Sequence, residues 1–373
     1  NLSIQNIVRF YPAPAEEEST GKSLWVWGKN DFGQLGLGDI DPRSSPVQLG
    51  SNTNWDTGLV KQHLLFVKED GTLWTWGRNN FGQLGQEDTT DRSSPVQVGT
   101  DTDWLKSAVG ISHSVALKTD GTLWVWGSSL HGELGFNDTT HISSPVQLGS
   151  DTEWVTIEGG YYQTVAIKTN GSLWSWGRNN QGKLGFGDTT DRSSPVQIGS
   201  DTDWLNIHTG GTDSVFAVKS DGSVWAWGYN HDGQLGLGHT NSVSSPTQIG
   251  SNNNWSKIYN NFYHTLAIQS DGSLWAWGRN DFGELGQEDI TNRSSPVQVG
   301  SDTDWISGAC SRDASLGIKS DGTLWSWGGN TNGELGLGDT DDKSSPVQVG
   351  SDTNWVSGNG FNGSLVFIKS VSS

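Results

Sequence analysis

A repeat of about 50 residues fills almost the whole chain and limits the folds that it can adopt. Trp-x-Trp pairs recur seven times, at successive steps of 49, 50, 50, 51, 50 and 50 residues. The pairs are Trp25/Trp27, Trp74/Trp76, Trp124/Trp126, Trp174/Trp176, Trp225/Trp227, Trp275/Trp277 and Trp325/Trp327. A third tryptophan keeps the same register at Trp55, Trp104, Trp154, Trp204, Trp255, Trp305 and Trp355. Three positions in seven copies account for all 21 tryptophans, so the sequence indicates seven equivalent structural units.

Each unit reads as a group of short β-strands. Residues 122–127 alternate with a period of two and are rich in aromatic residues, and residues 114–118 predict a second strand. The Asp120-Gly121 dipeptide between them predicts a type I′ hairpin turn, in which both central residues have positive φ. A third strand is expected to begin at Trp104. Residues 95–98 predict a fourth strand. Its proline fits an edge or the start of a strand, because proline cannot donate a hydrogen bond to the ladder.

The two ends of the chain supply complementary parts of one unit. Six hairpin turns are complete, whereas the strand 364–369 ends the chain where a seventh turn would follow, and the strand 23–27 begins the repeats. An open solenoid would need atypical capping repeats, and none is visible in the sequence. The prediction is an all-β protein: a seven-bladed β-propeller of four-stranded antiparallel blades over 21–373, with the ring closed by pairing of the N- and C-terminal strands. Residues 1–20 are predicted to be an N-terminal extension that acts as a docking segment or a linker.

The units share a second motif, Trp-Gly-x-Asn-x-x-Gly-Gln-Leu-Gly, seen at 76–85. Together with Gly-Ile-Ser-His-Ser-Val-Ala-Leu at 110–117, this motif closely resembles the regulator of chromosome condensation repeat. The resemblance covers about residues 21–373 and implies a seven-bladed propeller. It implies much less about function, because the family includes a nuclear guanine-nucleotide exchange factor, a plant ultraviolet-B photoreceptor, and many bacterial and phage surface proteins. The near-identical units of this chain are most similar to the bacterial and phage subgroup.

The charge of the chain excludes several classes of partner. Lys and Arg total 22 against 41 Asp and Glu, which gives a formal net charge of −19. An acidic surface repels phosphate, so neither nucleic acid nor an anionic membrane surface is expected as a partner. No apolar run approaches the roughly 18 residues of a membrane span, so membrane insertion is not expected. The single cysteine, Cys310, excludes an internal disulfide framework and a cysteine-based zinc finger.

No signature of enzyme chemistry is present in the sequence. His-Glu-x-x-His, the lipase-type Gly-x-Ser-x-Gly and a Walker A loop are all missing. We therefore predict a non-enzymatic protein with no catalytic residue, no metal site and no cofactor. Three of the eight histidines, His63, His113 and His264, occupy one equivalent position, and we interpret them as hydrogen-bonding or surface residues.

Acidic residues recur at the Leu-Gly-x-Gly-Asp turns and have two interpretations. They are Asp39, Asp88, Asp138, Asp188, Asp289 and Asp339, with His239 in the remaining unit. Calcium binding would need six to eight oxygen ligands at organised spacing, which these short turns do not show. Aspartate is also a standard turn residue whose side chain caps nearby backbone amides. Turn formation is therefore the favoured interpretation and calcium binding the alternative.

The turns that precede the alanine-rich strands differ between otherwise similar units. They should emerge together on one face of the ring, where aromatic residues on loops are frequent recognition anchors. We predict a ligand-binding site of Tyr161, Tyr162, Tyr259, Phe262, Tyr263 and Phe361. A second variable turn carries Phe32, Phe81, His131, Tyr229, His231 and Phe282. The alternative is that these rings only cover the junctions between blades.

These features favour a binding or structural role. The expected function is that of an extracellular or virion-surface propeller that binds a protein or a glycan through loops on one face, since its near-repetitive, Met-free composition suits an exposed component. The first alternative is a structural component of a virion or surface filament, docked onto neighbouring subunits through residues 1–20. The second alternative is a guanine-nucleotide exchange factor. The expected location is accordingly extracellular, at the cell surface or in a virion.

Overall fold

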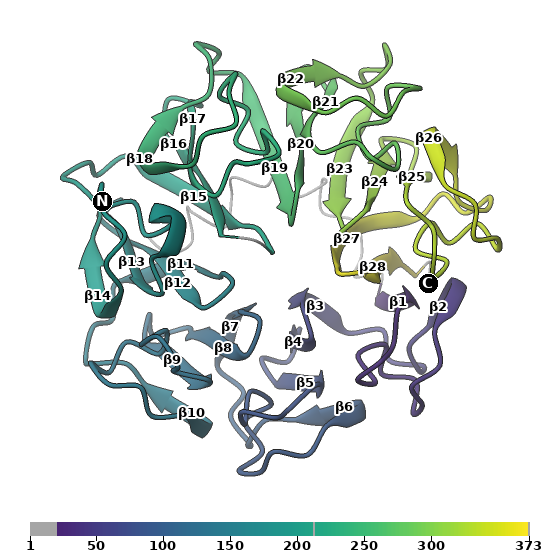
Figure 1. Ribbon diagram of the computed structural model, residues 1–373. Helices are drawn as coiled ribbons and strands as arrows, with labels where there is room; N and C mark the ends of the chain where they lie inside the picture. The colour runs from purple at the N-terminus through teal and green to yellow at the C-terminus, as the bar shows by residue number, and fades with distance from the viewer. Residues whose placement is uncertain (1–20, 212, 372–373) are drawn as a thin grey trace.

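Seven four-stranded antiparallel sheets are arranged around a ring in the computed structural model (Figure 1). The structure describes residues 21–211 and 213–371. Within these ranges there are 28 strands and one short 3₁₀ turn, η2 (Asn180–Gly182). The predicted all-β, seven-bladed propeller of four-stranded antiparallel blades is confirmed. The predicted extension, residues 1–20, lies outside the described residues.

We number the blades in chain order and name the strands of each blade a, b, c and d from the centre of the ring outward. Blades 1 and 2 are β3 (Trp55–Val60), β4 (His63–Lys68), β5 (Leu73–Gly77), β6 (Arg92–Gln97) and β7 (Trp104–Val109), β8 (His113–Lys118), β9 (Leu123–Gly127), β10 (Ile142–Gln147). Blades 3 and 4 are β11 (Trp154–Gly159), β12 (Gln163–Lys168), β13 (Leu173–Gly177), β14 (Arg192–Gln197) and β15 (Trp204–Thr209), β16 (Ser214–Lys219), β17 (Val224–Gly228), β18 (Val243–Gln248). Blades 5 and 6 are β19 (Trp255–Asn261), β20 (His264–Gln269), β21 (Leu274–Gly278), β22 (Arg293–Gln298) and β23 (Trp305–Cys310), β24 (Ala314–Lys319), β25 (Leu324–Gly328), β26 (Lys343–Gln348). Blade 7 is β27 (Trp355–Phe361), β28 (Ser364–Ser370), β1 (Lys22–Gly28) and β2 (Arg43–Gln48).

Blade 7 closes the ring from both ends of the chain, as the sequence predicts. Strand β28 pairs with β1 in antiparallel register from Lys22↔Ser370 to Gly28↔Ser364. Beyond this pair, the Val371 N–H donates to the Gly21 carbonyl oxygen over 2.7 Å. The two strand edges that an open array would expose are therefore paired with each other.

The b–c hairpin turns differ from the predicted type I′ geometry. The Gly71 N–H donates to the Lys68 carbonyl, and only the glycine of the Asp70-Gly71 pair has positive φ, at 75°. This is a type I turn followed by a left-handed glycine, a three-residue connection. The type I′ prediction is wrong because the aspartate keeps negative φ. Its carboxylate accepts the Thr72 N–H instead.

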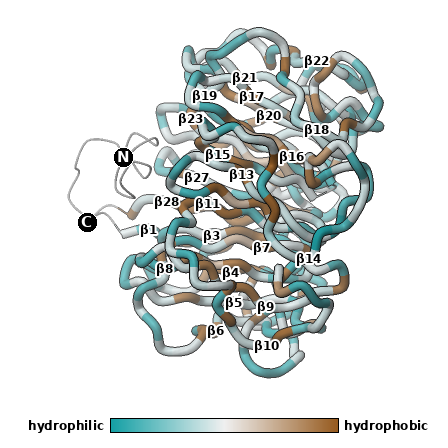
Figure 2. The backbone as a smooth tube through the Cα atoms, turned by 90° about the vertical axis from the view of Figure 1, so that its left-hand side faces the viewer, coloured by the Kyte–Doolittle hydropathy of each residue, from teal (hydrophilic) through white to brown (hydrophobic). Residues whose placement is uncertain are grey.

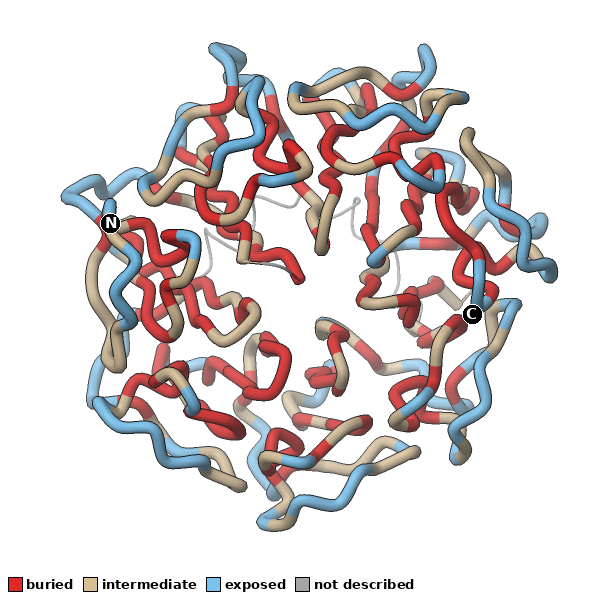
Figure 3. Tube along the Cα trace, in the orientation of Figure 1, coloured by how far each residue is buried: buried red, intermediate tan, exposed pale blue. Residues whose placement is uncertain are grey.

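Tryptophans of the c strands join each blade to the preceding one. The Nε1–H of Trp76 donates to the Gln34 carbonyl over 3.0 Å, and all seven blades repeat this bond. The second glycine of each Gly-x-Leu-Gly motif makes room for the ring, since a Cβ on Gly36 would lie 2.8 Å from Trp76 Nε1. The shared motif therefore has a structural role at the joint between blades. Buried residues follow the inner strands of each blade and exposed residues lie mainly toward the outer rim (Figure 3), and the apolar segments lie within the ring in the edge-on view of Figure 2.

Antiparallel pairing sorts the connections onto two faces of the ring. Strands a and c of each blade end on the same face, so the a–b turns and the long c–d loops share it. We call this the a–b face. The b–c turns and the connections from strand d to the next blade form the opposite face, which we call the b–c face. The a–b face therefore carries both of the variable turns that the sequence distinguishes.

Candidate functional site

The a–b face brings four of the six predicted binding residues to turns. Tyr161 and Tyr162 form the a–b turn of blade 3, where their rings meet edge to face with centroids 4.9 Å apart. Phe262 and Tyr263 form the turn of blade 5, with ring centroids 5.8 Å apart. All four side chains are half-buried, so each presents part of its ring to solvent.

The other two predicted residues lie away from the surface of the turns. Tyr259 is inside strand β19, where its ring packs beside Gly308 of the next blade and its hydroxyl lies 3.5 Å from Ser307 Oγ. Phe361 ends strand β27, is only 2% exposed, and stacks at an angle under Phe262 with centroids 4.9 Å apart. Phe361 therefore supports Phe262 from below. Strand a is one residue longer in blades 5 and 7 than in the other blades, and this explains the placement of Phe361. Tyr259 is the fifth residue of its strand, a position that lies inside strand a in every blade.

The second variable turn contributes to the same surface. His131, from the c–d loop of blade 2, approaches Tyr162 with ring centroids 5.3 Å apart. The guanidinium of Arg178 lies 5.9 Å from the centre of the Tyr162 ring. Residues that the sequence analysis assigned to two separate turns are thus neighbours across a blade boundary.

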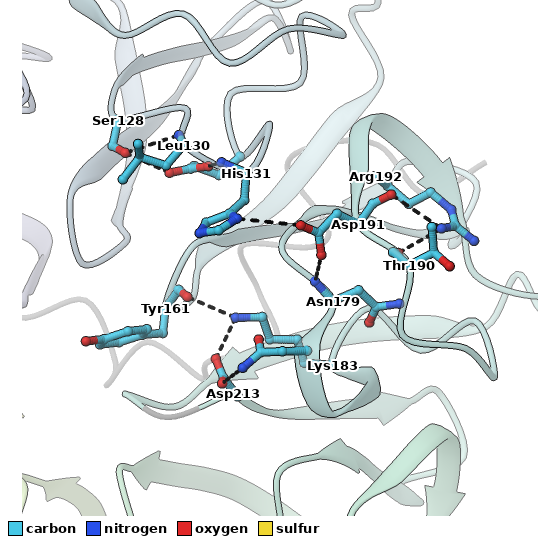
Figure 4. A network of polar contacts seen from close by, with 12 residues as sticks. Ser128, Leu130, His131, Tyr161, Asn179, Lys183, Thr190, Asp191, Arg192 and Asp213 are labelled. Carbon is cyan, nitrogen blue, oxygen red and sulfur yellow. Dashed lines mark hydrogen bonds and ion pairs between the residues drawn. The ribbon is translucent and has the colours of Figure 1, made fainter.

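A buried ion pair holds the turn of blade 3 in place (Figure 4). Lys183 Nζ lies 2.5 Å from Asp213 Oδ1 and donates to the Tyr161 carbonyl oxygen over 2.9 Å. The Lys183 side chain is fully buried, and the other Asp213 oxygen accepts from Asn180 Nδ2 over 2.9 Å. Burial lowers the pKa of Lys183, and the charge of Asp213 opposes that effect. One lysine therefore ties together turns of two adjacent blades.

The sequence reasoning missed this ion pair, although a signal was present. Six copies have Gln or Glu at the second position of Gly-x-Leu-Gly, and only blade 3 has a basic residue there, Lys183. In the other blades the side chain accepts a backbone N–H from its own loop, as Gln83 does from Phe81. Lysine has no acceptor, so it reaches toward the neighbouring turns instead.

The same turns adopt strained backbone conformations. Tyr162 has φ of 79°, and Asp213, Phe262 and Asn362 at the turns of blades 4, 5 and 7 also have positive φ. A bulky residue in this region costs of order 1–3 kcal/mol and persists only where its surroundings enforce it. The Lys183 bonds are such an enforcing contact for the turn of blade 3.

A second group of aromatic and charged side chains surrounds Arg279. Its guanidinium lies 4.8 Å from the centre of the Tyr263 ring and 5.3 Å from that of Phe282. The same guanidinium pairs with Asp281 at 2.8 Å and with Asp313 at 3.2 Å. Burial raises the pKa of Asp313, and Arg279 opposes that shift. This group continues the aromatic surface from blade 5 to blade 6.

The recurring acidic turns use their carboxylates within the fold. Asp88 Oδ1 accepts from Asn79 Nδ2 and from the Thr90 N–H, while Oδ2 pairs with Arg92 at 2.5 Å. Comparable pairs with Arg or Lys occur at Asp39, Asp188, Asp289 and Asp339. In the described part of the chain, no group of three or more His, Cys, Asp or Glu side chains is placed to hold a metal ion. These contacts support turn formation as the role of the acidic positions.

The three equivalent histidines are buried between blades. His63 Nε2 lies 2.7 Å from Ser114 Oγ of the next blade, and the Ser114 hydroxyl donates to the Gln83 carbonyl, so the histidine is the donor to serine. Burial lowers the pKa of His63 to about 3. Cys310 is buried too, and burial raises the pKa of its thiol. All of these groups are buried, so none is exposed on the a–b face.

No helix among the described residues is long and apolar enough to cross a membrane.

Comparisons with known proteins agree with this architecture. The structure is similar to Prp20p from Saccharomyces cerevisiae, with a TM-score of 0.84 and 21% identity over 95% of this chain and 93% of that one. It is also similar to human WBSCR16, with a TM-score of 0.82 and 20% identity over 94% of this chain and 100% of that one. Both likenesses concern the fold.

Sequence comparisons identify the family. A stretch of 42 residues is 50% identical to the E3 ubiquitin-protein ligase HERC2 of Homo sapiens and of Mus musculus. That stretch is 11% of this chain and about 1% of those much longer relatives. The family model described as WD40_RLD, RCC1-like domain, matches residues 20–365, so the chain belongs to the RCC1-like domain family.

Proposed function

We propose that the a–b face is a binding surface for a protein partner and that the chain acts as a non-enzymatic display scaffold. The observation that carries this proposal is the pair of half-exposed tyrosines, Tyr161 and Tyr162, on a strained turn that the buried Lys183–Asp213 pair holds from below. Aromatic rings pre-positioned in this way lose little entropy on binding, which is what a recognition anchor requires.

The solved relatives support a protein as the partner class. Prp20p has binding properties to Gsp1p and histones, and a second structure shows yeast Prp20 bound to Kap60. For the present chain, a net charge of −19 favours a basic partner, because complementary charge accelerates association. A glycan ligand is the alternative for the same face, since aromatic rings also stack on sugars. The extracellular or virion location stays a prediction from composition.

The proposal is tested with two double variants of the full chain. Tyr161→Ala with Tyr263→Ala removes anchors from the a–b face at positions whose φ is not positive. Ile306→Ala with Val356→Ala is the matched control, since both side chains are exposed, at 41% and 42%, near the start of strand a at the opposite face. Proteins from an extract of the source organism are captured on each immobilised chain, and the affinity of each purified candidate is then measured by calorimetry.

We expect a captured partner to bind the tyrosine variant roughly tenfold or more weakly than it binds the unchanged chain. The control variant should bind that partner with unchanged affinity. Equal affinity for both variants would contradict the assignment of the face. A parallel glycan array distinguishes the sugar alternative. Release of labelled nucleotide from small GTPases tests the exchange-factor alternative, and association through residues 1–20 is tested by deleting them.

A further inference from the structure

A lysine lies between two tryptophan rings in six of the seven blades. It is the last residue of strand b or, in blade 7, the second-last. Its Nζ lies over the tryptophan of strand a and over the first tryptophan of strand c. The distances from Nζ to the ring centroids run from 3.7 to 5.0 Å. The lysines are Lys68, Lys118, Lys168, Lys219, Lys319 and Lys369. We call this arrangement the lysine slot; it is a cation–π site that the chain fills with its own cation.

An aspartate three residues before the first tryptophan pairs with the lysine in five of these blades. The aspartates are Asp101, Asp151, Asp201, Asp302 and Asp352. Blade 1 has Asn52 at this position, and Lys68 still lies over both rings, at 4.6 and 4.0 Å. The aspartate is therefore not required for a cation to occupy the slot.

Blade 5 has the two rings without a lysine. Trp255 and Trp275 meet at 6.0 Å and 81°, within the range of 5.9 to 6.5 Å that the other blades show. Gln269 replaces the lysine, and Asn252 replaces the aspartate. Glutamine is neutral and one bond shorter than lysine. Its Oε1 accepts from Asn254 Nδ2 over 2.9 Å, which directs the amide toward that residue.

A cavity lies beside this slot. Its volume is about 430 Å³, and its lining includes both rings together with Gln269, Gln248, Asn252 and Pro296. Trp255 is 7% exposed, more than any of its six equivalents. A similar cavity of about 390 Å³ lies beside Trp104 and Trp124 in blade 2, but there Lys118 Nζ already lies 4.9 Å from each ring centroid.

We propose that the slot of blade 5 binds a methylated ammonium group supplied from outside the chain. Two perpendicular indole rings present their negative faces to the position that a lysine Nζ takes in six sister blades. Because the slot has Asn252 in place of a carboxylate, it favours a weakly hydrated methylated ammonium over the strongly hydrated primary ammonium of lysine. A trimethyl-lysine side chain and a free quaternary ammonium such as choline share this chemistry. The slot lies toward the b–c face, so this inference is independent of the proposed partner site.

Calorimetry with the full chain tests the site. Choline is compared with its uncharged isostere 3,3-dimethyl-1-butanol, and we expect choline to bind at one site roughly tenfold more tightly, because only the cation gains the interaction with the rings. Gln269→Lys rebuilds the arrangement of blade 1 and should remove choline binding. Lys68→Gln, where Asn52 leaves no unpaired carboxylate, should create a second site and double the stoichiometry. Thermal melts of each variant confirm that it is folded.

Two arms identify the source of the ammonium. Tighter binding of a short trimethyl-lysine peptide than of choline would point to a modified protein, and the reverse order to a free small molecule. The inference is overturned if choline and its uncharged isostere bind equally, if Gln269→Lys binds choline as the unchanged chain does, or if a folded chain shows no binding at tens of millimolar choline.

Discussion

Seven copies of one unit allow single residues to be compared in nearly constant surroundings. At the second position of Gly-x-Leu-Gly, Gln34, Gln83 and Gln234 each accept a backbone N–H from their own loop. Glu284 does the same through Oε2, at 2.8 Å from Phe282 N, while its Oε1 lies 3.7 Å from Arg279 Nε. Burial raises the pKa of Glu284 from 4.5 to about 7. This carboxyl group is thus held in a site suited to a neutral amide.

We expect Glu284→Gln to stabilise the protein at high pH. The pKa of the folded state, about 7, lies above the ordinary value of 4.5, so the folded state prefers the protonated form. The stabilisation that the protonated carboxyl group gives to the folded state is fully present below pH 4.5 and is lost as the pH rises through 7. The free energy of unfolding of the variant should therefore exceed that of the original chain by about 1–3 kcal/mol at pH 8.5. At pH 4.5 the two should differ little. Denaturant titrations at both pH values measure this, and an equal difference at both would contradict it.

A second residue-scale prediction concerns Lys183, for which its equivalents supply the replacement. Lys183→Gln should restore the local bond that Gln83 makes and leave Asp213 without its charged partner. Leaving one member of a buried pair uncompensated costs about 3–5 kcal/mol. A double variant with Asp213→Gln, the residue at the equivalent position 62 of blade 1, should recover part of that loss. Thermal melts measure both, and the absence of any recovery would show that the two residues are not coupled.

At the scale of the blade, hydrogen bonds across the junctions complement the packing of the tryptophans. His63, His113 and His264 each contact a hydroxyl of the following blade, at 2.7, 3.1 and 2.8 Å. Burial lowers the pKa of all three to about 3. The blades are thus joined by neutral imidazoles, and the junctions should be sensitive to acid.

The triple variant His63→Gln, His113→Gln and His264→Gln should lose less stability on acidification. Since the histidine pKa in the folded state lies below the ordinary 6.5, their stabilisation is present above pH 6.5 and is lost as the pH falls toward 3. Each histidine contributes at most about 1.4 kcal/mol per pH unit in that range. Glutamine occurs naturally at the equivalent position 163. Melting temperatures between pH 7 and pH 4.5 should fall less steeply in the variant; parallel curves would refute the role of these histidines.

At the scale of the molecule, the ring depends on pairing between the two ends of the chain. Strands β1 and β28 are neighbours in one sheet, and residues 21 and 371 are joined by a hydrogen bond. The chain ends could therefore lie in another blade without changing the fold, whereas the pairing of β1 with β28 is required.

A circular permutant should fold to the same propeller. Residue 371 is joined to residue 21 by a short Gly-Ser linker, and new ends are made between Gly149 and Ser150, in the exposed connection after β10. We expect a melting temperature within about 5 °C of the original, because permutation is tolerated at exposed connections. Deletion of residues 364–370 should instead abolish cooperative unfolding, since it removes a central strand of blade 7. Failure of the permutant to fold would show that closure requires the native order of the blades.

The sequence alone determined the blades and the closure of the ring. Its tryptophan register marks strands whose side chains must alternate between two neighbouring blades, and a repeat broken between two termini can hide its edges only by joining them. It also predicted which turns carry Tyr161, Tyr162, Phe262 and Tyr263, because turn residues are the ones that a repeat leaves variable.

The tertiary structure decided which side chains meet. The Lys183–Asp213 pair joins different blades, Phe361 is covered by Phe262, and the slot of blade 5 is recognised because six other blades show where a cation lies between the same rings. None of these contacts follows from local periodicity. Each depends on the distance and angle between neighbouring blades, and those are set by how the whole ring packs.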